Sequence, residues 1–144
     1  MALPARNPYD QYKHTEINTA NQGKLIVMLY DGAIKFCNIA IENMQPKTYD
    51  IANINIIKAQ DIINELILAL NMNDGGDIAR NLFNLYIYFK KQLLEANIQK
   101  NSDILKNVVK LLKELRDAWD KISAQETPSD RVATASKGSF SIEG

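Results

Sequence analysis

Residues that most often carry chemistry in proteins are scarce in this sequence. It has one histidine, His14, and one cysteine, Cys37. No acid–base partner lies near His14 in the chain, and Cys37 lies among apolar residues, where a thiol is usually buried and inert. The sequence has neither a Glu-x-x-His pair for the di-iron chemistry of helical bundles nor a Cys-x-x-Cys pair for zinc. We therefore predict no catalytic residue, no metal and no cofactor.

Two further patterns resemble functional motifs but lack an essential part. Residues 74–77 are Asp-Gly-Gly-Asp, yet no Gly-Lys-Ser/Thr follows, so a phosphate-binding loop is not predicted. Several carboxylates fall at helical spacing on charged faces: Asp61, Glu65, Asp117 and Asp120. Carboxylates in that pattern usually form a solvated helix surface. The sequence does not predict an enzyme.

Composition narrows the class of protein and its partners. The chain has 144 residues, enough for one domain, and its 17 basic and 17 acidic residues cancel. This balance argues against a nucleic-acid partner, which favours a basic excess. The longest apolar run, Leu25–Tyr30, is too short to enter and cross a bilayer. The N-terminus lacks the apolar stretch of a secretory signal, and one cysteine suits a reducing compartment, so we expect a cytoplasmic protein.

Four segments have the apolar spacing of helices and are separated by short polar links: 20–44, 48–72, 77–98 and 103–123. Long helices joined by short links predict an all-α fold, an antiparallel up-down four-helix bundle. We expect this helical domain to span 1–128 and to begin with a short lead helix at 7–15. Ser, Thr, Ala and Gly replace the periodic pattern in 129–144, which predicts a flexible, disordered tail.

Local signals mark the ends of these helices. Thr19 and Gln22 have the spacing of a capping box. Thr48 is the candidate N-cap of the second helix, and Asn101 or Ser102 that of the fourth. The sequence Asn-Asp-Gly-Gly at 73–76 should end the second helix.

The first helix is more apolar than a surface helix needs to be. Between Leu25 and Ile41, polar side chains form one narrow stripe that includes Asp31, Lys35 and Asn38. The rest of its circumference requires cover. We expect it to be the central helix of the bundle, covered by the other helices and by the N-terminal lead.

The second helix combines a core stripe with a border of neutral amides. The core stripe is Ala52, Ile56, Ala59, Ile63, Leu66 and Leu70, and the amides are Asn53, Gln60, Asn64 and Asn71. Such amides can donate to and accept from the backbone of a docked chain. A boundary hydrated by solvent explains them equally well, and both interpretations stay open.

The third and fourth helices also have predicted core faces. That of the third is Ile78, Leu82, Leu85, Phe89 and Ala96, and that of the fourth is Ile104, Val108, Leu111, Leu115, Ala118 and Ile122. The third helix has a surplus: Phe83, Tyr86, Ile87, Tyr88 and Leu94. A tyrosine at a groove edge can keep its hydroxyl in water. The surplus indicates either such a groove or a wide packing face.

Several segments form a longer pattern in a fixed order. They are Asn7-Pro8-Tyr9-Asp10-Gln11-Tyr12, Asn18-Thr19-Ala20, Lys24-Leu25-Ile26-Val27-Met28-Leu29-Tyr30-Asp31-Gly32-Ala33, Ala59-Gln60-Asp61-Ile62-Ile63-Asn64-Glu65-Leu66 with Leu70-Asn71, Gly75-Gly76-Asp77-Ile78-Ala79-Arg80-Asn81-Leu82, Leu85-Tyr86 and Leu115-Arg116-Asp117-Ala118-Trp119. This pattern resembles the FliS family of flagellin export chaperones over residues 7–123. One departure is Asn21-Gln22, where the family leads us to expect a proline near the helix start.

The resemblance implies a cytoplasmic chaperone built as an antiparallel helical bundle. Such proteins bind the disordered C-terminal segment of new flagellin, prevent premature polymerisation and aid its delivery to the flagellar type III export gate. The resemblance implies no nucleotide or metal. It also gives Tyr9 and Tyr12 a capping role over part of the binding surface, although simple anchoring of a short lead helix would explain them too.

A bundle with surplus apolar surface can bind a partner helix in a groove. From helical angles we expect the partner-binding residues to be Ile56, Ile57, Gln60, Asn64, Ile67, Asn71, Leu82, Phe83 and Tyr86. Ile57→Asp or Ile67→Asp should weaken flagellin binding and leave the helices intact. The alternative is a helical adaptor that binds another secretion or flagellar regulatory protein, and a self-associating bundle is third. We expect a monomer or weak homodimer that has no nucleic-acid partner and does not insert into membranes.

Overall fold

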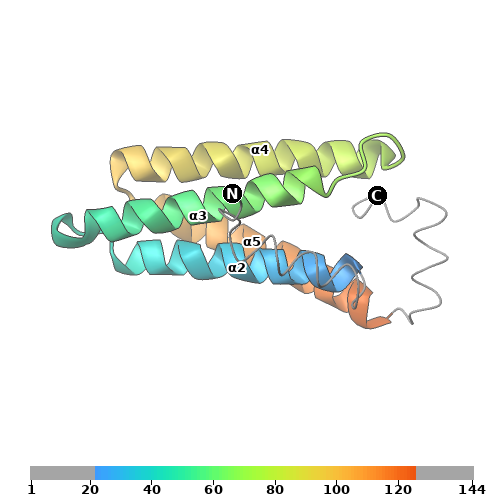
Figure 1. Cartoon of the computed structure of the whole chain (residues 1–144), viewed down its shortest axis with the longest axis horizontal. Coiled ribbons are helices and arrows are strands. Elements are labelled where there is room, and N and C mark those ends of the chain that lie inside the picture. Colours follow the sequence, from blue (N-terminus) through green and yellow to red (C-terminus); the bar gives the residue numbers. More distant parts are fainter. Residues whose placement is uncertain (1–21, 126–144) are drawn as a thin grey trace, which may run out of the picture.

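A computed structural model describes residues 22–125, and this part of the chain is helical without strands. It contains α2 (Gln22–Glu42), the short 3-10 helix η1 (Pro46–Thr48), α3 (Tyr49–Leu68), α4 (Gly76–Gln99) and α5 (Ser102–Gln125). Figure 1 shows each long helix running back along the one before it. The predicted all-α bundle is confirmed. The expected lead helix at 7–15, the tail at 129–144 and the Thr19 cap lie outside the described residues.

The over-apolar helix α2 contacts both α3 and α5 along its length. Its buried side chains include Leu25, Ile26 and Cys37, whereas Asp31 and Lys35 on the predicted polar stripe are exposed. At the outer edge, Asp31 forms an ion pair with Arg116 of α5. Helices α3 and α5 therefore bury most of the apolar surface of α2.

The core stripe predicted for the second helix is buried at all six residues, five of them in α3 and Leu70 just beyond its end: Ala52, Ile56, Ala59, Ile63, Leu66 and Leu70. Thr48 occupies the predicted N-cap position of α3, but its hydroxyl donates to the carbonyl of Asn43 at 2.9 Å and makes no cap hydrogen bond. The helix ends at Leu68 rather than residue 72. Beyond it, the Asn71 side-chain oxygen accepts from the backbone N–H of Asp74 at 3.0 Å, which favours a turn over a further helical turn.

The core faces of α4 and α5 are rotated from the predicted ones. Ile78 is exposed, and Tyr86 and Leu93 are fully buried. On α5 the deepest residues are Leu105, Val108, Leu112 and Trp119, whereas Ala118 and Ile122 are exposed. Apolar residues occupy a wide arc on both helices, so packing against the neighbouring helices decides which part of the arc is buried.

The link between α4 and α5 follows its predicted chemistry. The Asn101 side-chain oxygen accepts from the backbone N–H of Asp103 at 2.9 Å, which confirms Asn101 as the cap of α5. Lys100 has a φ of 53° and ends α4 in the left-handed conformation. The backbone N–H of Asn101 then donates to the carbonyl of Ala96 at 3.1 Å. This C-terminal motif turns the chain sharply into α5.

Candidate functional site

A buried tyrosine pair fixes the position of α4 across the bundle. The hydroxyls of Tyr30 on α2 and Tyr86 on α4 are 2.6 Å apart and hydrogen-bonded. Burial raises the pKa of Tyr86 to about 12, although its bond to Tyr30 acts in the opposite direction. Burial and the neighbouring Tyr86 raise the pKa of Tyr30 further. Tyr86 is therefore a core residue, which corrects its predicted place in a partner groove.

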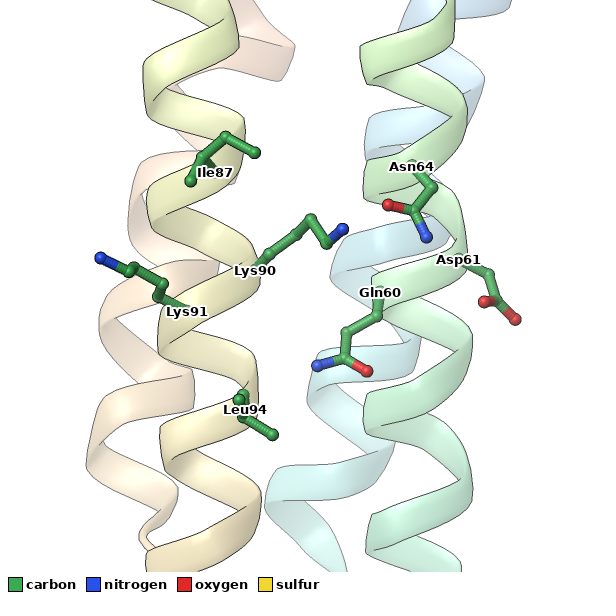
Figure 2. A pocket seen from close by; sticks show the side chains of 7 residues that line it. All are labelled: Gln60, Asp61, Asn64, Ile87, Lys90, Lys91 and Leu94. Atoms are coloured by element: carbon green, nitrogen blue, oxygen red, sulfur yellow. The ribbon is translucent and has the colours of Figure 1, made fainter.

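An open groove lies between α3 and α4. Its volume is about 430 Å³, and its lining residues are Gln60, Asp61 and Asn64 of α3 with Ile87, Lys90, Lys91 and Leu94 of α4. Figure 2 shows the amides of Gln60 and Asn64 directed toward α4, with Lys90 and Leu94 directed toward α3. Asp61 and Lys91 are directed away from the space between the helices. The groove floor thus combines apolar, amide and cationic groups.

Only Gln60 and Asn64 of the predicted binding residues line this cavity. Ile57 lies one turn before them on α3 and is half exposed, so it borders the groove. Ile67, Leu82 and Phe83 are partly buried against the core.

Of the other predicted binding residues, Ile56 lies in the core and Asn71 lies in a loop. Ile56 is fully buried in the core and cannot touch a docked chain, so its assignment to the groove is wrong. Asn71 lies in the turn after α3, where both of its side-chain polar atoms bond to Asp74. Tyr9 and Tyr12 lie outside the described residues.

The border amides of α3 divide between internal and open roles. The Asn97 side chain donates to Asn53 at 2.6 Å and accepts from the Lys100 ammonium at 2.7 Å. That ammonium also lies 5.3 Å from the ring centre of Tyr49. These contacts join α3 to α4 at one end of the groove. Asn53 and Asn71 are thus used within the chain, and Gln60 and Asn64 keep their amides in the groove.

Sequence reasoning missed Lys90 as a groove residue. Phe83, Ile87, Lys90 and Leu94 repeat at separations of four, three and four, which places them along one side of α4. Ile87 and Leu94 already stood out as surplus apolar residues. The lysine between them could have indicated a groove residue, because its charged end must turn either to water or into a neighbouring groove.

Exposed apolar side chains extend the groove on both helices. On α3 they are Ile54, Ile57 and Leu68, and on α4 they are Leu94 and Ile98. Their helical spacing places them beside the lining residues. We call these five residues together the outer face of α3 and α4. Exposed apolar side chains gathered beside a groove are typical of surfaces that bind another molecule.

The chemistry of the described residues is that of binding. No cluster of His, Cys, Asp or Glu able to hold a metal occurs among residues 22–125. Burial raises the pKa of the Cys37 thiol to about 12, which keeps it protonated and inert. None of the helices described here has the length and apolar character needed to cross a membrane. The fold and the groove define a helical-bundle protein that binds other polypeptides.

Comparison with known proteins identifies the family. The family described as "Flagellar protein FliS" matches residues 5–126. The flagellar secretion chaperone FliS of Bacillus subtilis is 36% identical over 129 residues, covering 90% of this chain and 95% of the relative. The chaperone of the same name from Vibrio cholerae is 34% identical, covering 75% and 79%, and that of Escherichia coli is 30% identical, covering 72% and 76%. The chain belongs to the FliS family.

This membership assigns the general function. The relatives are flagellar secretion chaperones, so the protein is a flagellar chaperone and not an enzyme. A chaperone acts on a protein partner, and the groove between α3 and α4 is a surface suited to one.

Proposed function

We propose that this protein binds the disordered C-terminal segment of flagellin in the cytoplasm, prevents its premature polymerisation and aids its delivery to the flagellar type III export apparatus. The observation that supports this most directly is the groove with its apolar outer face. Polymer-forming segments carry apolar helix faces that must be covered before assembly. A groove bordered by exposed isoleucine and leucine can cover such a face.

The size of the outer face fits a segment that folds on binding. Its five side chains are between 45% and 74% exposed, so covering them gains about 1 kcal/mol each. The ordering of a disordered segment costs roughly 2–5 kcal/mol. The outer face therefore offsets the cost of ordering, and the groove floor and further contacts must supply the net affinity.

Binding of flagellin by calorimetry tests the proposal, with Ile57→Asp as the diagnostic variant. A charge at residue 57 would be buried without a partner in the complex, so affinity should fall by more than about tenfold. Ile57 is half exposed, so far-ultraviolet circular dichroism should be unchanged. Ile122→Asp is the matched control, because Ile122 is an exposed isoleucine on α5, which does not line the groove. Unchanged affinity of Ile57→Asp would remove the groove from the binding surface.

Truncation of the partner tests the assignment to flagellin itself. The chaperone should capture full-length flagellin and fail to capture flagellin that lacks its C-terminal segment. Equal capture of both would contradict the proposed function. The adaptor hypothesis would then be the better one, with another secretion or flagellar regulatory protein as the occupant of the groove.

A further inference from the structure

Among the charged residues that line the groove, Lys90 is the cation whose side chain points into it. Its side chain is partly buried, and Figure 2 shows it extending from α4 toward α3, between the levels of Gln60 and Asn64. Lys91 and Asp61, the other charged lining residues, are directed away. The groove therefore presents one positive charge, close to two side-chain amides.

The one acidic side chain among the lining residues of the groove, Asp61, is directed away from Lys90. The residues three and four positions away on α4 are Tyr86, Ile87, Leu93 and Leu94, none of which is acidic. Within residues 22–125, no carboxylate lies within ion-pair distance of the Lys90 ammonium. Arg116 on α5 is a contrast, since it pairs with Asp31 at 2.8 Å and with two acidic residues of its own helix.

We propose that the groove recognises an acidic side chain, an Asp or Glu flanked by apolar residues, in the bound flagellin segment. The Lys90 ammonium is its charge partner, and N–H groups of Gln60 and Asn64 are further donors. This inference rests on the proposed function and specifies what its partner must carry. A carboxylate accepts several hydrogen bonds and donates none, which matches a site made of one ammonium and two amides.

The position of Lys90 sets the expected pattern in the partner. Ile54 and Leu68 are the first and last α3 residues of the outer face, and at 1.5 Å per residue they are about 21 Å apart. Gln60 and Asn64, which face Lys90, lie between these ends. The acidic side chain should therefore lie inside an apolar stretch of the partner, with apolar residues on both sides. Those neighbours exclude water from the ion pair and strengthen it.

Charge removal at Lys90 is the direct test, with Lys91→Gln as the matched control. Lys90→Gln keeps a polar chain of similar shape and should weaken binding of the flagellin C-terminal segment about fivefold to tenfold in calorimetry at low salt. The loss should shrink in about 0.5 M NaCl, because the wild-type pair is then screened. Lys91→Gln should bind within about twofold of wild type, since Lys91 faces away from the groove.

Amide substitutions in the partner provide the second arm. Each Asp or Glu of the segment is replaced in turn by Asn or Gln, and one replacement should weaken binding to wild type but have little further effect on Lys90→Gln. A segment amidated at its C-terminus should bind like the unmodified one. If amidation, and no side-chain replacement, reproduced the loss, the acidic side chain would be the wrong assignment.

The outcomes separate this inference from the proposed function. If Ile57→Asp abolishes binding but Lys90→Gln binds as wild type does, the groove binds flagellin and the ion-pair inference is overturned. If the wild-type protein does not bind the segment at all, the proposed function and the inference that rests on it both fail. A salt-dependent loss confined to Lys90→Gln supports both.

Discussion

The hydrogen bond between Tyr30 and Tyr86 allows a sharp test of how the bundle is held together. The two hydroxyls are 2.6 Å apart in the core and bond to each other. Removing either one therefore leaves the other buried without that partner. Removing both should cost less than the sum of the two single removals.

The magnitudes follow from which groups lose a partner. Tyr30→Phe and Tyr86→Phe each leave one buried hydroxyl without its partner, so each should lower the free energy of unfolding by about 1–3 kcal/mol. In the double variant neither hydroxyl remains, so its cost should be smaller than the sum of the two single costs.

Urea denaturation followed by far-ultraviolet circular dichroism measures these three free energies, with the denaturant slope compared across variants. All three should unfold in one transition with an unchanged slope. Additive costs in the double variant would refute the hydrogen-bonded pair described here. Phenylalanine keeps the ring packing, so the differences report on the hydroxyls.

Two further predictions concern pH and the two sides of α3. The pKa values of both buried tyrosines are raised above the ordinary value of 10.0, so their contribution to stability should be fully present below pH 10. It should then be lost as the pH rises toward 12, and pH-dependent urea titrations of the double phenylalanine variant should show a smaller loss. On α3, Ile56→Ala should lower the free energy of unfolding by about 2–5 kcal/mol, because Ile56 is fully buried. Ile57→Ala, one position along, should cost less than about 1 kcal/mol in the same urea assay and instead weaken flagellin binding.

The sequence predicted the helices well where the pattern was unambiguous. All six residues of the core stripe predicted for the second helix are buried, and the buried face extends to Ile62 beside them. On α4 and α5 the apolar residues cover wider arcs, so the sequence did not determine which part faces the core. Ile78 and Ile122 were predicted to be buried and are exposed for this reason.

The candidate site was harder to predict because its geometry depends on contacts distant in sequence. Tyr86 fits a groove edge if its hydroxyl needs water, but Tyr30, 56 positions away, supplies the hydrogen bond instead. Asn53 and Gln60 belong to the same amide border, yet only Asn53 meets an amide of α4. The inward direction of Lys90 depends on the space left between α3 and α4. None of these pairings can be found from the periodicity of one helix.

The outer face of α3 and α4 also bears on the colloidal behaviour of the free protein. The chain has a formal net charge of zero at pH 7 and an isoelectric point near 6.6, so copies do not repel one another through net charge. Exposed isoleucine and leucine side chains then attract one another without an opposing field. We expect the solubility of the free chaperone to be lowest near neutral pH. A bound partner that covers this face should raise it, which makes the supply of partner a determinant of how much chaperone stays in solution.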